Sequence, residues 1–249
     1  MRLLFVIVFF VTTAWGIVPI KPREVGENPG TSGEIAVALQ TKRGNTDKDN
    51  YTLSLKMKYD SNTSWLAWGM LRGEYGEALG ERNVNNVFSH FRYIQNLTGN
   101  FLAFELFAQI QADEFKSIKN RSLGGGGLRW KAAREDSEWG GAFLGLGAFY
   151  EYVGYATEAD PLERNVRINA YLAYTFTFEQ AGLFTVVGYF QPKIDDFSDY
   201  LAIVAANVEV SVYKQLYVSL YISYEYDAVP AADVKKEDFT QQTLIKYKF

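Results

Sequence analysis

The sequence predicts an all-β fold: a transmembrane antiparallel β-barrel of about twelve strands with up-and-down topology. Segments of about ten to fifteen residues alternate apolar and polar side chains and are separated by turn residues, as in strands with one lipid-facing side. Aromatic residues make up 16% of the 249 residues, with 17 Tyr and 18 Phe, although the mean hydropathy is slightly negative. No apolar run reaches roughly 18 residues, which excludes a helical membrane protein.

The N-terminus has the pattern of a secretory signal peptide. Arg2 supplies a positive charge, an apolar run extends from Leu3 to Ala14, and Gly16 offers a small residue for cleavage. The run is shorter than the roughly 20 residues that a spanning helix needs. We expect a signal peptide over residues 1–16, an unstructured periplasmic lead over 17–32, and an outer-membrane β-barrel over 33–249, in the bacterial outer membrane of a Gram-negative cell. The chain has no cysteine, so disulfides do not stabilise it after export.

The predicted strands place alternate side chains on opposite faces. The clearest apolar row is Tyr51, Leu53, Leu55, Met57 and Tyr59. Tyrosine ends this row on both sides, as aromatic belts at the two membrane interfaces require. The predicted strands cover residues 33–42, 50–60, 64–75, 83–95, 101–111, 121–132, 139–152, 163–178, 182–192, 199–212, 215–226 and 239–249.

The predicted connections alternate in length, as short periplasmic turns and long external loops do in outer-membrane barrels. The tight turns are 60–63, 96–100, 179–181 and 213–214. The longer, more charged links are 43–49, 76–82, 112–120, 153–162, 192–198 and 227–238. The link at 133–138 is longer than a tight turn and fits this alternation less well.

A soluble β-sandwich or a lipocalin-like barrel would show the same alternation, with the apolar rows turned inward. The long strands, the tyrosines at row ends and the final Phe249 favour the membrane barrel. An open sheet edge has no hydrogen-bonding partner in lipid, so the sheet must close. Arg92, Arg129 and Arg167 fall on the predicted interior faces, whereas at lipid-facing mid-strand positions each would cost roughly 2–4 kcal/mol.

The last strand carries a candidate assembly signal. Tyr247 and Phe249 stand at alternate positions, and such an apolar-faced strand can pair with an exposed strand edge. We expect these two residues to be recognised by the outer-membrane barrel assembly machinery. The other expected partners are outer-membrane lipids and lipopolysaccharide. The net charge of −4 excludes a strongly basic nucleic-acid binder, and nothing in the sequence indicates an oligomeric state.

Short motifs distributed from about Thr31 to the C-terminus resemble the bacterial family called domain of unknown function 481 (DUF481), whose members carry the label salt-induced outer membrane protein. The resemblance implies an outer-membrane barrel and no particular reaction. The matching residues are Gly44-Asn45-Thr46, Phe91-Arg92-Tyr93, Asp113-Glu114-Phe115, Arg121, Gly124 to Gly127, Leu128-Arg129-Trp130, Tyr189, Gln191-Pro192, Asp196, Asp199-Tyr200, Ser223 to Asp227, Tyr247 and Phe249.

Acidic and basic side chains share the predicted interior. The lumen-lining candidates are Arg92, Glu105, Arg129, Glu151, Arg167, Glu209 and Glu225. In one reading they line a narrow, porin-like channel that passes small solutes or ions and selects by charge. In the other they pair across an occluded lumen, and the protein is a structural or surface-interaction barrel linked to an envelope response to salt. The width of a twelve-stranded barrel fits both readings.

The chemistry-bearing residues give little support to an enzyme, and we expect none. An outer-membrane lipase would need a Ser and a polar residue near His90, but Ser89 points to the opposite face of the strand. Gly124 to Gly127 lacks the ending of a phosphate loop and is expected to allow bending or close packing. A possible external cation site comprises Asp195, Asp196, Asp199 and Asp227, although lysines such as Lys116 and Lys193 favour a solvated charged rim. No cofactor and no metal-ligand motif are predicted.

Overall fold

The computed structural model describes residues 25–26, 29–42, 48–78, 80–99, 101–133, 140–156, 162–178 and 182–249. The predicted signal peptide lies outside the described residues. Twelve strands and one short 3-10 helix follow one another: β1 (Gly30–Lys42), β2 (Lys48–Asp60), β3 (Trp65–Ala78), β4 (Glu81–Thr98), β5 (Leu102–Asp113), η1 (Glu114–Lys116), β6 (Ile118–Ala133), β7 (Gly141–Tyr155), β8 (Glu163–Phe178), β9 (Gly182–Pro192), β10 (Tyr200–Tyr213), β11 (Leu216–Asp227) and β12 (Glu237–Lys248).

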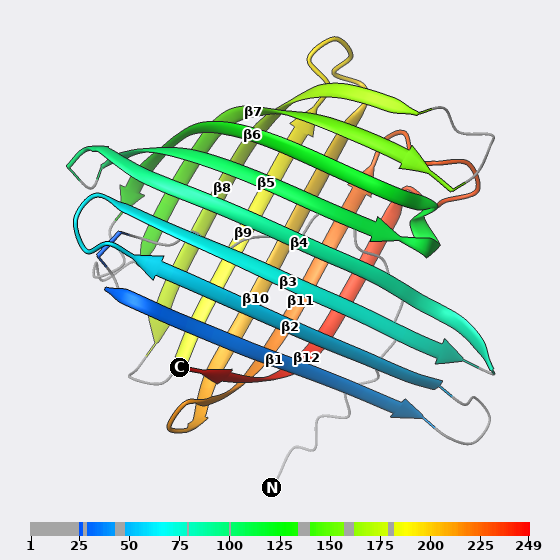
Figure 1. Cartoon of the computed structure of the whole chain (residues 1–249), viewed down its shortest axis with the longest axis horizontal. Coiled ribbons are helices and arrows are strands. Elements are labelled where there is room, and N and C mark those ends of the chain that lie inside the picture. Colours follow the sequence, from blue (N-terminus) through cyan, green and yellow to red (C-terminus); the bar gives the residue numbers. More distant parts are fainter. Residues whose placement is uncertain are drawn as a thin grey trace, which may run out of the picture.

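The strands form a single closed barrel, which confirms the predicted fold class (Figure 1). Each strand pairs antiparallel with the next in the chain, and β12 returns to pair with β1. The first residues of β1 and the C-terminus therefore lie at the same end of the barrel, which we call the turn end. We call the opposite end the loop end. Among the described residues, no helix is long and apolar enough to cross a membrane.

Side chains alternate between the two faces of the wall as the sequence predicts. On β2 the apolar row headed by Tyr51 and Leu53 is exposed, whereas Thr52, Ser54 and Lys58 are buried inside the barrel. This is the reverse of a soluble barrel, in which the apolar row would be the buried one. The parity of β2 therefore places its apolar side chains outside and its polar side chains inside, whereas the inner faces of β8, β9 and β10 also carry a buried apolar cluster that includes Tyr171, Val187 and Ile203.

Aromatic rings form rows on the outer face near both ends. At the turn end, Trp65 lies 5.3 Å from Tyr59 and 5.9 Å from Tyr93, measured between ring centroids. At the loop end, Tyr200 lies 5.3 Å from Phe190 and 5.6 Å from Tyr226. Each row crosses three neighbouring strands, as a girdle at a membrane interface would.

Every strand end lies within three residues of the sequence prediction, but two of the differences change what a segment was expected to be. The predicted long link over 76–82 is wrong, because β3 continues to Ala78 and β4 begins at Glu81, with a register shift between Gly76 and Glu77. Gly76 does not break the strand but permits a close approach, since a Cβ atom there would lie 2.7 Å from the side-chain oxygen of Asn83. In addition, β1 begins at Gly30, so residues 30–32 of the predicted unstructured lead are in a strand.

Glycines on the inner face allow a close approach of backbone and side chains where β6 and β7 pair. A Cβ atom at Gly127 would lie 2.6 Å from the carbonyl oxygen of Leu146 and 2.7 Å from the Cα of Gly147. The ring of Tyr171 occupies the space that a side chain at Gly145 would need. These glycines thus allow close packing, which is one of the two structural roles expected of them.

Candidate functional site

The interior of the barrel is the candidate site. The structure places all seven predicted lumen residues on the inner face, and each is 6% exposed or less. Such burial requires that every charge has a partner, because an unpaired buried charge is costly. The partners show whether the lumen is open or filled.

Glu105 on β5 forms the first cluster, in the half of the barrel nearer the turn end. Its carboxylate lies 3.4 Å from Arg92 and 3.3 Å from Arg129, on the two neighbouring strands. Tyr171 donates a hydrogen bond to it from β8 at 2.7 Å. The guanidinium groups also pack on aromatic rings, Arg92 over Phe107 and Arg129 over Phe143. One carboxylate therefore bridges two cations, and the rings fill the space around them.

Glu151 on β7 forms the second cluster, nearer the loop end. Arg121 donates to one carboxylate oxygen at 2.6 Å, and Arg167 donates to the other at 2.5 Å. Arg167 continues to the side chain of Asp199 at 2.9 Å and to the backbone oxygen of Gln191 at 3.2 Å. The cluster thus ties β6, β7 and β8 to the segment that follows β9.

The four carboxylates proposed as an external cation site do not converge. Asp199 binds Arg167 and Lys193. Asp196 accepts hydrogen bonds from the backbone and hydroxyl of Ser198, which hold the pKa of its carboxyl below the ordinary value. Asp227 accepts from the backbone of Val229, and Asp195 is exposed. In the described part of the chain, no group of three or more His, Cys, Asp or Glu side chains could hold a metal ion.

The expected solvated rim is wrong for Lys116, which turns into the lumen, and Lys193 is likewise paired with carboxylates instead of being solvated. Lys116 on η1 reaches across the barrel to Glu225 on β11 at 3.1 Å and Asp238 on β12 at 2.9 Å. Burial opposes the charge of Lys116, but the two carboxylates outweigh it and raise the pKa of the ammonium group. Lys193 lies 3.3 Å from Glu163, and its pKa is raised in the same way by Asp199 and Glu163.

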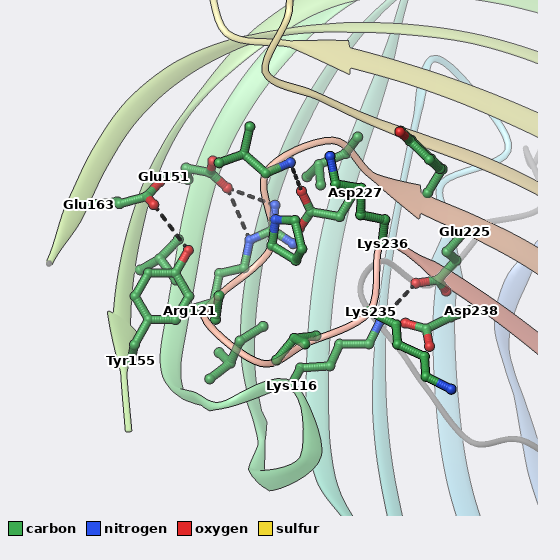
Figure 2. A pocket seen from close by; sticks show the side chains of 18 of the residues that line it. Lys116, Arg121, Glu151, Tyr155, Glu163, Glu225, Asp227, Lys235, Lys236 and Asp238 are labelled. Carbon is green, nitrogen blue, oxygen red and sulfur yellow. Dashed lines mark hydrogen bonds and ion pairs between the residues drawn. The ribbon is translucent and has the colours of Figure 1, made fainter. Parts of the chain in front are cut away.

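These side chains surround an open cavity of about 710 Å³ at the loop end (Figure 2). Figure 2 shows Lys116 directed toward Glu225, and Arg121 toward Glu151, with the cavity between them. The segment between β11 and β12 also lines it and buries Ala228 and Ala231. We call this space the loop-end cavity.

A second cavity of about 960 Å³ lies nearer the turn end, and we call it the turn-end cavity. Its cations are Lys56, Arg72, Lys246 and Lys248, and its carboxylates are Glu34 and Glu209. Glu209, a predicted lumen residue, pairs with Lys246 at 3.0 Å and with Lys248. Glu74, on β3, pairs with Arg72 of the lining and accepts hydrogen bonds from Thr52 at 3.2 Å and Gln242 at 2.9 Å.

The two cavities share no lining residue, and an apolar contact occupies the middle of the barrel. Phe88 on β4 packs with Met70 on β3 and with Tyr221 on β11, from the opposite wall. His90 is buried beside it, with its ring 4.9 Å from Trp68 and 6.3 Å from Phe88. This contact brings side chains of the two walls together in the middle of the barrel.

The turn end is partly covered by the residues before β1. Val25 packs against the cluster of Leu66, Trp68, Ile94 and Ala103 on the inner face. The backbone N–H of Gly26 donates to both oxygens of Asp60, at 3.0 and 2.9 Å. The described part of the lead therefore lies against the mouth of the barrel.

Sequence reasoning missed several of these residues as lumen residues, although strand parity was available for most of them. Arg121 is eight residues before Arg129 on the same face of β6, and Arg72 and Glu74 share the inner face of β3. Strand parity could not identify Lys116, because this residue lies on a turn and not on a strand. The conformation of that turn follows from the capping of η1. Asp113 accepts hydrogen bonds from the backbone of Phe115 and Lys116 and fixes that turn.

The barrel is similar to solved outer-membrane barrels. The translocator domain of autotransporter NalP from Neisseria meningitidis is 8% identical, with a TM-score of 0.51, over 90% of this chain and 89% of that chain. A NanC porin structure is 14% identical, with a TM-score of 0.45, over 88% and 98% of the two chains. LpxR from Salmonella typhimurium is 12% identical, with a TM-score of 0.44, over 88% and 99%. At these identities the likeness concerns the fold alone.

Sequence comparison identifies the family. No curated protein matches the chain. A family profile described as a protein of unknown function, DUF481, matches residues 35–249, which span all but the first few residues of the barrel. The chain therefore belongs to the DUF481 family.

Proposed function

We propose that this protein is a non-enzymatic β-barrel of the bacterial outer membrane whose lumen is occluded in its resting state, a structural or surface-interaction barrel. The observation that supports an occluded lumen is the burial of the charged side chains on the inner face. In an open, water-filled channel the charges that line the path would be accessible to solvent. Here all seven predicted lumen residues are buried, and ion pairs or hydrogen bonds join each of them to a partner.

The location in the membrane is supported by the wall of the barrel. An exposed apolar face between two aromatic rows matches the lipid-facing band of outer-membrane barrels. A closed barrel is also one of the two structures that satisfy the backbone within lipid. In this orientation the turn end faces the periplasm and the loop end faces the exterior.

The absence of enzymatic activity is supported by the surroundings of the only histidine. His90 is held between two aromatic rings on the inner face, whereas Ser89 is on the outer face. A Ser–His pair within hydrogen-bond reach, which a lipase requires, is not formed by these two residues. The link to salt stress and the assembly role of Tyr247 and Phe249 stay predictions.

Single-molecule conductance tests the occluded lumen. The refolded protein is inserted in a planar bilayer, and we expect no stable open steps. A steady, porin-like conductance in the unmodified protein would refute the proposal. Fractionation tests the location separately: the protein should stay with outer-membrane fragments and require detergent for release.

A gated narrow channel is the second candidate, and one observation favours it. Cavities of about 710 and 960 Å³ approach the middle of the barrel from its two ends. The contact of Met70, Phe88 and Tyr221 lies between them, and Tyr221 also packs against a buried apolar cluster that includes Tyr189 and Ile203. Rotation of these side chains would join the cavities, and substitution of Phe88 distinguishes the two candidates.

A further inference from the structure

The seam where the barrel closes is incomplete. The ladder between β1 and β12 holds four residue pairs, from Glu34–Lys248 to Val37–Ile245. One further bonded pair joins Gly33 to Phe249. By comparison, β1 pairs with β2 along its whole length, from Gly30 to Lys42. Beyond Val37, the described residues of β1 make no ladder pair with β12.

The unpaired stretch begins at Ala38 and Leu39 of β1, and on its other side Leu39 pairs with Tyr51 of β2. Continuing the register would set Ala38 opposite Leu244 and Leu39 opposite Thr243, and neither pair forms among the described residues. Leu39 is 68% exposed, in keeping with a missing neighbour on one side. A strand edge without a partner is unfavourable in lipid. A gap at this place therefore calls for a ligand or for a functional reason.

Polar side chains close the gap from the inside. Gln242 on β12 reaches past β1 and donates to Thr52 on β2 at 3.1 Å and to Glu74 on β3 at 2.9 Å. Arg72 in turn donates to Gln242 at 2.5 Å. These are side-chain contacts, which can break without unpairing any strand. They form a latch between the seam and the lumen.

The turn-end cavity lies behind the paired stretch of the seam and reaches the unpaired stretch at Leu244. Ala36 of β1 and Leu244 and Lys246 of β12 line it. Its charged lining consists of four cations and two carboxylates, of which Lys246 and Lys248 pair with Glu209, while Arg72 pairs with Glu74 outside the lining. Its apolar lining consists of Met70, Leu183, Val187, Ala205 and Leu244. A ligand that suits this cavity has a negative group and a hydrocarbon part.

We propose that the seam between β1 and β12 is a lateral opening through which a lipid with an anionic headgroup passes between the membrane and the turn-end cavity. This rests on the proposed membrane location. The headgroup meets Lys56 and Lys246, and the acyl chain remains in the gap beside Leu39. The Gln242 latch closes the opening when no lipid is bound.

Cross-linking of the seam tests the route, because the chain has no cysteine of its own. In the variant Leu39→Cys/Thr243→Cys, a flexible bifunctional methanethiosulfonate reagent ties the unzipped stretch together. The control Val37→Cys/Ile245→Cys ties a stretch that is already paired and is also on the outer face. Uptake of phosphatidylglycerol by the folded barrel in detergent is followed by native mass spectrometry. We expect uptake to slow by about tenfold or more in the first variant and to be unchanged in the control.

Ligand chemistry is tested with three probes and two charge variants. Phosphatidylglycerol should be retained about tenfold better than phosphatidylcholine or glycerol 3-phosphate. Lys56→Gln/Lys246→Gln should lose this preference, whereas Lys235→Gln/Lys236→Gln, at the loop-end cavity, should keep it.

Unchanged uptake after seam cross-linking, or equal binding of glycerol 3-phosphate, would overturn the lateral route. Cross-linking of the single variant Leu39→Cys to a second copy of itself would also overturn it, since a neighbouring barrel would then cover the edge. A protein that folds without detergent would instead defeat the membrane location.

Discussion

The ring of Phe249, the last residue, lies against the backbone of Gly33 on the first strand, so that a Cβ atom at Gly33 would come within 2.5 Å of the ring. The same two residues exchange both backbone hydrogen bonds, at 2.7 and 3.0 Å. Phe249 also stacks on Tyr247, with ring centroids 6.2 Å apart. The chain end thus seals the short ladder on which closure of the barrel depends.

Gly33→Val should therefore weaken closure. The new side chain forces the ring of Phe249 aside, and the lost packing should cost about 1 kcal/mol. The temperature at which the folded form disappears from an unheated SDS gel should fall. Gly73→Val is the control, because Gly73 is also on the outer face and has nothing within 4 Å of its Cβ position. Equal losses in both variants would show that the contact with Phe249 has no special part in closure.

Glu151→Gln should destabilise the barrel strongly. The substitution leaves Arg121 and Arg167 buried around a neutral amide, and breaking a buried pair in this way costs about 3 kcal/mol or more. Unfolding of the reconstituted protein in urea measures the loss. In Glu114→Gln the partner is Arg82 and both side chains are about half exposed, so the loss should be within about 1 kcal/mol. A small effect in Glu151→Gln would mean that water reaches this cluster.

The fold followed from the sequence because a strand with period 2 reports directly which side chains face hydrocarbon. All twelve strands and the inward direction of Arg92, Glu105 and Glu151 depend only on that parity. The strand ends were harder to predict. Gly76 is a residue type typical of turns, but it continues a strand, in which it pairs with Asn50 of β2 and Val84 of β4.

Parity could not predict which charges meet. Glu105 binds residues of the neighbouring strands, whereas Lys116 binds Glu225, 109 positions further along the chain. Whether Lys116 and Glu225 meet in space depends on the curvature of the wall and on how the short turn at η1 folds inward. The unzipped seam was equally hidden, because β1 and β12 both have the pattern of complete strands. Register between the first and last strands is a property of the closed barrel.

Phe88→Ala should separate an occluded barrel from a gated channel. Removing the ring opens the contact with Met70 and Tyr221 between the two cavities. If the protein is a gated channel, brief conductance steps should appear in a planar bilayer that the unmodified protein does not show. Phe91→Ala, on the outer face of the same strand, is the control and should remain silent. Silence in Phe88→Ala, with normal folding on an unheated gel, would favour the occluded barrel.

The stability that Lys116 contributes to the barrel should be lost at alkaline pH. Its ammonium group is paired with Glu225 and Asp238, and they raise its pKa above the ordinary 10.5 in the folded protein. A raised pKa means that the pair contributes its full stability below pH 10.5 and loses it as the pH rises through the folded value. Lys116→Met removes the contribution at every pH. The difference in melting temperature between the unmodified protein and Lys116→Met should therefore be constant at neutral pH and shrink above about pH 10.5. Lys235→Met, which removes an exposed lysine at the same cavity, should show a small difference that does not change in this range. A difference for Lys116→Met that stays constant to the highest pH reached would mean that packing of the side chain, and not its charge, holds η1 across the lumen.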